Sequence, residues 1–432
     1  MTETTWQAPR LTYSHEHFQT VTNLSAEDAA KKLPPARLQG ELPPITDTPA
    51  ALETAINALA SSSGPIAIDT ERAQGFRYGQ DTWLIQIKRG QAGTFLIDSH
   101  VLPNLHELGA VLDDEWIFHA ANQDLPALAA QGMIAPSLFD TETAARLVGF
   151  RQFSLASLVE QLLGLKLEKN HQAENWSVRP LPRDWLRYAA MDVELLQELR
   201  DLLVKRLEKL GRHQWAMQEF DYQLTHVLKF HEPHWRELKG IGRLRTAREL
   251  AIARELFNIR EKIGKQEDLA TNLVLSAKGI IEAAEAYPTT RNQFMRLREF
   301  QTPQARPHRE EFWAAIVRAR TLSADELPNP HVTHSADYIP PLKYWKRSHP
   351  EAHRRLLAVR ELVEARGQQL DLDPQVVLQP KMQRQLAWKT LPSARLEVLV
   401  ERLQEAEARP WQIEQFLMAV QAQPEGLSSL TR

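Results

Sequence analysis

The chain has 432 residues, of which 43% are hydrophobic and 25% charged, with a net charge of −3 at pH 7. This length predicts roughly two to four globular domains. The absence of cysteine excludes disulfides, thiolate zinc sites and cysteine nucleophiles, and it fits a reducing compartment. Neither a secretion signal nor an apolar run of ~18 residues is present, so we expect a cytoplasmic protein with no membrane partner.

Polar and proline-rich residues 1–40 predict an N-terminal extension. A helix is expected over residues 47–60, with Thr48 or Asp47 as its cap, before strands at 66–69, 83–87 and 93–99. Helices at 102–112 and 123–132 then enclose a short strand at 115–120, and residues 137–149 add a strand and a helix. This alternation predicts an α/β domain with a mixed sheet.

Beyond about residue 200 the strand patterns stop and helical periodicity continues to the end. Residues 321–345 are proline-rich and lack periodicity, which predicts a linker. The helical segment 250–260, LAIARELFNIR, aligns without a gap with segment 356–366, LLAVRELVEAR. A repeat interval of about a hundred residues is too long for a solenoid and indicates a duplicated domain.

An acidic pair ends the first predicted strand of the α/β region. Asp69 and Glu71 stand two residues apart, so their side chains share one face of the strand. Two neighbouring carboxylates repel each other unless an arginine, a shared proton or a metal ion lies between them. Taken alone, such a pair is more often structural than functional.

Two later segments carry further candidate acids. Asp124 follows the short strand at the start of a helix, where an acid also favours the helix dipole. Tyr188 and Asp192 stand four residues apart in a helical pattern and therefore share one helix face, although a surface acid beside a packed tyrosine would give the same pattern. Asp140 is expected to cap the helix that follows it.

Taken together, DTER, FHAANQDL, FDTETAARLVG and NWSVRPLPRDWLRYAAMDVELL resemble the exonuclease motifs of the DEDD family, and the tyrosine resembles its DEDDy branch. The block is similar to ribonuclease D in the form seen in actinobacteria, over residues 41–206. The helical half resembles two HRDC modules. The resemblance implies an α/β ribonuclease H-like exonuclease domain with a mixed sheet at 41–210, HRDC domains at 228–320 and 346–426, and a linker at 321–345.

The resemblance also implies that Asp69, Glu71, Asp124 and Asp192 bind two divalent ions, Mg²⁺ or Mn²⁺, and that Tyr188 orients the attacking water. Carboxylate oxygens are the ligands that these ions prefer, and two ions ~4 Å apart suit in-line phosphoryl displacement. Arg72 is next to Glu71 but is expected on the opposite strand face, and a shared proton cannot neutralise four acids. A metal site is therefore the preferred interpretation.

Three further residues are candidates for substrate binding. Phe76 could stack on a terminal base, with core packing or an exposed turn as the alternative. His119 follows a strand, where a structural histidine is the commoner role. Arg179 could contact a substrate phosphate or form a structural salt bridge.

These patterns predict a metal-dependent 3′→5′ exoribonuclease that releases nucleoside 5′-monophosphates. The expected partner is RNA with a free 3′ end, and the resemblance implies processing of transfer RNA precursors. Two alternatives are a 3′→5′ DNA exonuclease, because the same acids act on either sugar, and a non-catalytic nucleic-acid-binding protein. The presence of all four acids and Tyr188 argues against the second alternative.

Overall fold

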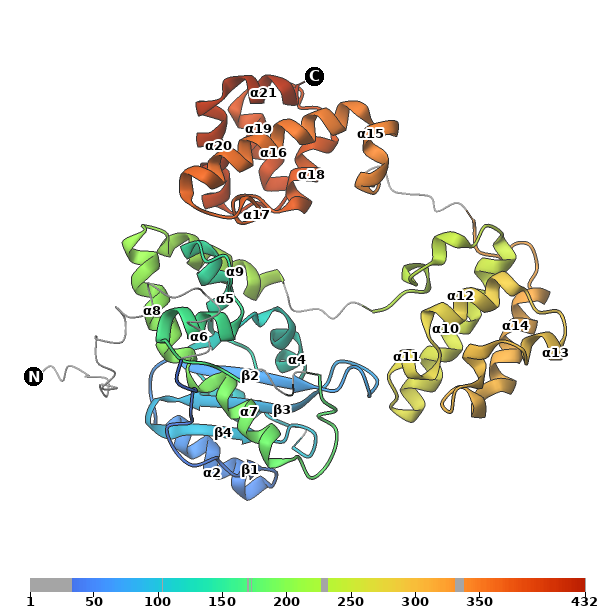
Figure 1. The fold of residues 1–432 in the computed structure, drawn as a ribbon, viewed down its shortest axis with the longest axis horizontal. Helices are drawn as coiled ribbons and strands as arrows, with labels where there is room; N and C mark the ends of the chain where they lie inside the picture. Colours follow the sequence, from blue (N-terminus) through green and yellow to red (C-terminus); the bar gives the residue numbers. More distant parts are fainter. Residues whose placement is uncertain are drawn as a thin grey trace, which may run out of the picture.

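A computed structural model describes residues 33–102, 104–168, 171, 173–226, 232–330 and 338–431. An α/β domain comes first and two helical regions follow it (Figure 1). The α/β domain and each helical region have hydrophobic cores of their own. Most of the expected N-terminal extension and the centre of the expected linker lie outside the described residues.

The α/β domain contains a six-stranded mixed sheet in the order β1-β4-β3-β2-β5-β6. β2 pairs antiparallel with β3, and β3 pairs antiparallel with β4, whereas the β1–β4, β2–β5 and β5–β6 pairs are parallel. The mixed sheet predicted from the sequence is therefore confirmed. The strands are β1 Ile45–Thr46, β2 Ile66–Arg72, β3 Thr82–Arg89, β4 Gly93–Ile97, β5 Glu115–Phe118 and β6 Ser137–Asp140.

Helices cover both faces of this sheet, and every residue of β3 is buried. Leu84 and Leu96 pack with the alanines of α7, while Ile85 and Ile87 belong to the larger core on the other face. The helices are α2 Pro49–Ala60, α3 His106–Val111, α4 Asp124–Ala130, α5 Thr141–Val148, α6 Leu155–Leu163, α7 Arg183–Glu194, α8 Leu196–Lys209 and α9 His213–His226. No described helix is long and apolar enough to cross a bilayer.

The sequence located most of these elements but not their ends. Thr48 caps α2 through a hydrogen bond from the backbone N–H of Ala51, as expected. β2 continues three residues beyond Asp69 because residues 70–72 still pair with β3. The two-residue strand β1 was not predicted, since so short a strand gives no periodic signal.

The first helical region packs around a core formed mainly by the long helix α10, which contacts α12 and α14. Its helices are α10 Ala247–Glu267, α11 Thr271–Val274, α12 Ala277–Ala286, α13 Arg291–Phe294 and α14 Arg309–Thr321. The second region is built likewise around α16, which packs on α17, α18, α20 and α21. Its helices are α15 Trp345–Ser348, α16 Pro350–Leu370, α17 Pro374–Val377, α18 Pro380–Trp388, α19 Leu396–Glu405, α20 Pro410–Ala422 and α21 Pro424–Leu430.

The two helical regions repeat one design, but in a register that differs from the ungapped sequence alignment. α10 and α16 each have 21 residues, and both ends of α16 lie 103 residues after those of α10, whereas the sequence alignment implied 106. Gly264 and Gly367 correspond at the 103-residue spacing, and an added Cβ at either would lie 3.0 Å from a carbonyl oxygen just beyond the helix end. A shift of three residues is close to one helical turn of 3.6 residues. The apolar faces of the two helices therefore still match in the ungapped alignment, although its register is wrong.

Both long helices end at an aspartate in the left-handed conformation, Asp268 at φ 50° and Asp371 at φ 51°. Asp268 pairs with Arg77 at 3.3 Å and accepts a hydrogen bond from the backbone N–H of Tyr78 at 3.2 Å. Asp371 pairs with Arg151 at 3.0 Å. Each helical region therefore contacts the α/β domain through the aspartate that ends its long helix.

Candidate active site

Three carboxylates from two elements converge at one end of β2. Asp69 and Glu71 lie on β2, and Asp192 lies on α7. One oxygen from each of these three side chains lies within 4.8 Å of the other two. The i, i+2 spacing places the first two on one strand face, and α7 crosses that face in contact with β2, β3 and β4. The predicted gathering of these three acids is therefore present in the fold.

Burial and mutual repulsion make the charged forms of these acids costly. Burial raises the pKa of Asp69 well above its usual range, and the charges of Asp124 and Asp192 raise it further. Burial likewise raises the pKa of Glu71, with a further increase from the charge of Asp69. A cation bound among these oxygens would remove the repulsion, and the hard oxygen donor set suits a divalent ion such as Mg²⁺.

Tyr188 lies one helical turn before Asp192 on α7, as its spacing predicts. Burial raises the pKa of Asp192 to about 7, and a hydrogen bond from Tyr188 partly opposes this rise. Burial raises the pKa of Tyr188 above its usual value, and the charges of Asp192 and Glu71 raise it further. The phenol therefore stays protonated near neutral pH and can donate a hydrogen bond, but it cannot act as a base there.

Asp124 begins α4 beside the three-acid cluster, and its charge is the second cause of the raised pKa of Asp69. Its own carboxylate accepts a 2.5 Å hydrogen bond from the hydroxyl of Thr70 and lies 3.9 Å from the guanidinium of Arg72. Burial raises the pKa of Asp124 to about 6, and these two partners hold it down. Asp124 is thus near the cluster but has partners of its own.

The position of Arg72 corrects the expectation that it points away from the acids. A register irregularity between Glu71 and Arg72 breaks the strict alternation of β2. Arg72 therefore reaches the residue just before α4, where it donates to the carbonyl oxygen of Gln123 at 2.6 Å and to its side-chain oxygen at 2.9 Å. No sequence pattern indicated Thr70 or Gln123 as partners of the site, and Arg72 was considered there but expected on the opposite strand face.

Asp140 caps α5 as predicted, accepting hydrogen bonds from the backbone N–H groups of Glu142 and Thr143. It also accepts from the N–H groups of Ala120 and Ala121, both at 3.1 Å. Ala120 adopts the left-handed conformation at φ 66°, a strained position for an alanine. Asp140 therefore holds the turn that leads from β5 to Asp124.

The three substrate-binding candidates lie in different settings. Arg179 makes two hydrogen bonds to Asp98, at 2.6 and 2.8 Å, and three more to carbonyl oxygens, so it has the structural role weighed for it. His119 bonds the hydroxyl of Thr141 at 2.9 Å, and burial lowers its pKa. Phe76 is 36% exposed, and its carbonyl oxygen accepts from the N–H of Ala270 in the first helical region.

Family comparisons divide the chain at the same places as the fold. Residues 43–208 match a family described as 3′-5′ exonuclease, residues 249–316 match the HRDC domain, and residues 338–422 match the 3′ to 5′ exonuclease C-terminal domain. The mixed-sheet α/β domain with its acid cluster is therefore a 3′-5′ exonuclease domain, and helical domains follow it. That the second helical region is also an HRDC module stays a prediction.

Individual relatives narrow the class further. A curated ribonuclease D from Gluconacetobacter diazotrophicus is 31% identical over 243 residues, which are 54% of this chain and 61% of that protein. The crystal structure of a protein from Bifidobacterium adolescentis is 33% identical with a TM-score of 0.82, and the match covers 92% of this chain and 98% of that one. The Escherichia coli RNase D structure, titled an exoribonuclease involved in structured RNA processing, is 25% identical with a TM-score of 0.64, covering 84% and 98%.

The chain carries a 3′-5′ exonuclease domain and an HRDC domain, and it is similar to curated ribonucleases D. It matches 56% to 63% of the length of the first curated relatives. The similarity rests on the exonuclease domain, the HRDC domain and the fold shared with the Escherichia coli RNase D structure.

Proposed function

We propose that this chain is a divalent-metal-dependent 3′→5′ exoribonuclease that releases nucleoside 5′-monophosphates. The observation that carries the proposal is the convergence of Asp69, Glu71 and Asp192 within 4.8 Å, in a domain that matches the 3′-5′ exonuclease family. Asp124 and Tyr188 complete the catalytic set. Curated ribonucleases D among the relatives support RNA as the substrate.

Asp69, Glu71, Asp192 and Asp124 would together hold two divalent ions, which we propose to be Mg²⁺ or Mn²⁺. Bound there, such ions would supply activation of a water nucleophile and stabilisation of the leaving 3′ oxygen. Asp124 is 6% exposed and bonded to Thr70, so binding would require its carboxylate to exchange that partner or share it. Arg72, 3.9 Å away, adds positive charge beside the expected path of the phosphate.

We propose that Tyr188 orients the attacking water. Its hydroxyl stays protonated at neutral pH because its pKa is raised, so it can donate a hydrogen bond to a water or to a phosphate oxygen in the cleft. Trp176 packs against Trp185 with ring centroids 5.4 Å apart and the rings tilted by 59°, and these contacts help to fix α7 against the sheet. A fixed donor costs no reorganisation when charge develops on the reacting phosphate.

Tests of this proposal begin with hydrolysis of a 5′-labelled RNA in the presence of Mg²⁺ or Mn²⁺. We expect stepwise shortening from the 3′ end, its loss with EDTA, and its loss in Asp69→Ala and Asp192→Asn. Matched DNA, which differs in lacking the 2′-hydroxyl, separates a ribonuclease from a DNA exonuclease. Substrates with 3′-phosphate ends and transfer RNA precursors test the need for a free 3′-hydroxyl and the proposed substrate class. RNA bound but left intact with either ion would refute the proposal.

We also propose the domain limits 41–210 for the exonuclease domain, 228–320 and 346–426 for two HRDC domains, and 321–345 for the linker. The three hydrophobic cores support this division, although Trp411 of the second helical region packs into the core of the α/β domain. Limited proteolysis tests it, since cleavage should concentrate between these limits.

A further inference from the structure

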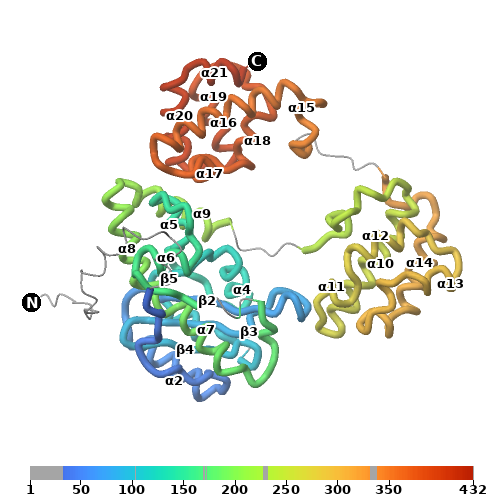
Figure 2. Tube along the Cα trace, viewed as in Figure 1, coloured from blue at the N-terminus to red at the C-terminus, as the bar shows by residue number. Residues whose placement is uncertain are grey.

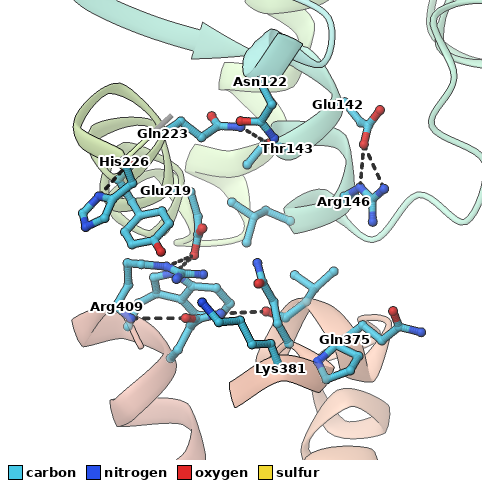
Figure 3. Close-up of a pocket in the computed structure, with 17 residues that line it drawn as sticks. Asn122, Glu142, Thr143, Arg146, Glu219, Gln223, His226, Gln375, Lys381 and Arg409 are labelled. Carbon is cyan, nitrogen blue, oxygen red and sulfur yellow. Dashed lines mark hydrogen bonds and ion pairs between the residues drawn. The ribbon is translucent and has the colours of Figure 1, made fainter. Parts of the chain in front are cut away.

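A cavity of about 590 Å³ lies between the α/β domain and the second helical region (Figure 3). α5 and α9 form one wall, and α17, α18 and the start of α20 form the other. Figure 2 shows where these helices lie in the whole chain. Asp69, Glu71 and Asp192 do not line it. Its volume is typical of a small-molecule binding site.

Two buried polar atoms in the walls have no hydrogen-bond partner in the described part of the chain. Arg409 is 5% exposed; its Nε donates to Glu219 at 2.8 Å and its Nη1 to a carbonyl oxygen at 3.0 Å, but its Nη2 is unpaired. Gln223 is 8% exposed, and its Oε1 is unpaired. An unsatisfied buried donor and acceptor each cost free energy, so a ligand that bonds both is favoured.

Side-chain amides dominate the rest of the cavity. Asn122, Gln375 and Gln379 line it and are exposed, whereas Gln412 is fully buried and bonds the backbone through both ends of its amide. An amide offers a donor and an acceptor side by side, which matches the edge of a nucleobase. Three amides are therefore available to a ligand, and one is structural.

Aromatic and cationic groups occupy the side of the cavity that α9 forms. The rings of Tyr222 and His226 stack with centroids 3.9 Å apart, and the guanidinium of Arg409 lies 4.4 Å from the Tyr222 ring centroid. Lys381 is largely exposed and lines the opposite wall. Lys381 pairs with Glu407 at 3.4 Å, but this pair is largely exposed, so the lysine can exchange it for a phosphate. Aromatic rings beside amides and a cation suit a base with its phosphate.

Gln223 connects this cavity to the turn that carries Asp124. Its Nε2 donates to Asp140 at 3.0 Å, and Asp140 holds the N–H groups of Ala120 and Ala121. Asn122, at the cavity rim, stands two residues before Asp124. The turn that carries Asp124 therefore also contributes Asn122 to the cavity.

We propose that the cavity binds one nucleotide of single-stranded RNA, upstream of the 3′-terminal nucleotide. This inference rests on the proposed exoribonuclease function. The exposed amides of Gln375 and Gln379 bond the base edge, and Lys381 faces the phosphate. The unpaired Arg409 Nη2 and Gln223 Oε1 favour a polar ligand there. A simple anion fits less well, because Glu219 and Glu142 already pair with Arg409 and Arg146 in the cavity wall.

The test is the affinity of the full chain for a single-stranded RNA of about 12 nucleotides, measured in EDTA so that no cleavage occurs. Gln375→Ala/Gln379→Ala changes two exposed amides and leaves the buried pairs intact. We expect this variant to bind the RNA about tenfold more weakly, as for the loss of much of one nucleotide's contacts. The control Gln404→Ala/Gln421→Ala removes two exposed amides of the same region outside the cavity, and it should bind like the parent.

Cross-linking locates the nucleotide. A single 4-thiouridine is moved one position at a time from the 3′ end, and we expect attachment to Tyr222 or His226 from one internal position only. Equal affinity of both double variants for RNA, or cross-links confined to other surfaces, would overturn the proposal. If the parent then still hydrolyses RNA with Mg²⁺, the nuclease assignment stands and only the cavity assignment fails.

A free mononucleotide is the other source of the same chemistry. Titration calorimetry with AMP and CMP, on the parent and on Gln375→Ala/Gln379→Ala, separates the two sources. Mononucleotide binding that the variant loses, together with unchanged RNA affinity, would assign the cavity to product and refute its role in holding the RNA strand.

Discussion

Replacing Asp192 with asparagine should make the metal-free protein more stable at pH 8, although it removes a catalytic group. Burial raises the pKa of Asp192 from 3.8 to about 7. The folded state therefore binds a proton more tightly than the unfolded state, and stability falls as the pH rises from about 4 through 7. Asparagine is uncharged and can still accept the hydrogen bond from Tyr188, so it avoids this penalty.

The size of the effect follows from the pKa difference. A rise from 3.8 to about 7 corresponds to at most about 4 kcal/mol when the acid is ionised. The Asp192 side chain keeps some contact with water, and this contact lowers the cost, so we expect about 2 kcal/mol. For a domain of this size that corresponds to a Tm increase of about 4 to 8 °C at pH 8.

The assay is thermal unfolding of the parent and of Asp192→Asn between pH 4 and 8, in EDTA and in excess Mg²⁺. The difference in Tm should be largest at pH 8 and close to zero at pH 4. Mg²⁺ should raise the Tm of the parent more than that of the variant, because the ion relieves the repulsion. Asp184→Asn, an exposed change on the same helix, is the matched control. A variant that is less stable than the parent at pH 8 without metal would refute the reasoning.

Three further outcomes are expected. Tyr188→Phe should lower kcat on RNA by about 10- to 100-fold while metal affinity is retained, because only a positioned donor is lost; an unchanged kcat would contradict this role. Asp268→Ala should speed hydrogen exchange at Tyr78 while global stability changes by less than ~1 kcal/mol, since this ion pair is largely exposed; equal exchange in parent and variant would argue against docking through this aspartate. Trp411→Ala should destabilise the second helical region by about 3 to 5 kcal/mol in denaturant unfolding, because a buried ring stacked on Trp215 is removed; a loss below about 1 kcal/mol would show that this contact does not hold the two parts together.

The sequence predicted those parts of the site that depend on periodicity. Asp69 and Glu71 follow from the two-residue period of a strand, and Tyr188 with Asp192 follows from the four-residue spacing of a helix. Each pair is local, so its shared face can be read without knowing the fold. That the two pairs meet depends on α7 crossing β2, which only the resemblance implied.

The irregular parts of the site were not predictable in the same way. Arg72 was placed on the wrong face because a strand irregularity after Glu71 breaks the alternation on which the inference rested. Gln223 lies 83 residues from its partner Asp140, and no local pattern links them. Contacts of this kind depend on tertiary packing, which a single sequence does not reveal.

The repeat in the helical half shows a related limit. The aligned segments 250–260 and 356–366 correctly indicated two similar regions, but their register was off by three residues. Because three residues make nearly one helical turn, apolar residues coincide in both registers, and the sequence pattern alone does not distinguish them. The matched glycines Gly264 and Gly367 resolve the choice, because each permits the chain to fold back closely after its helix.

The proposed function requires that acids from separate segments bind divalent ions at the end of β2. Anomalous diffraction from crystals grown with Mn²⁺ and a short RNA tests it most directly. We expect Mn²⁺ in direct contact with carboxylate oxygens of Asp69, Glu71 and Asp192, with the 3′-terminal phosphate beside it. Mn²⁺ bound only elsewhere, with these three acids protonated and bonded to one another, would contradict it.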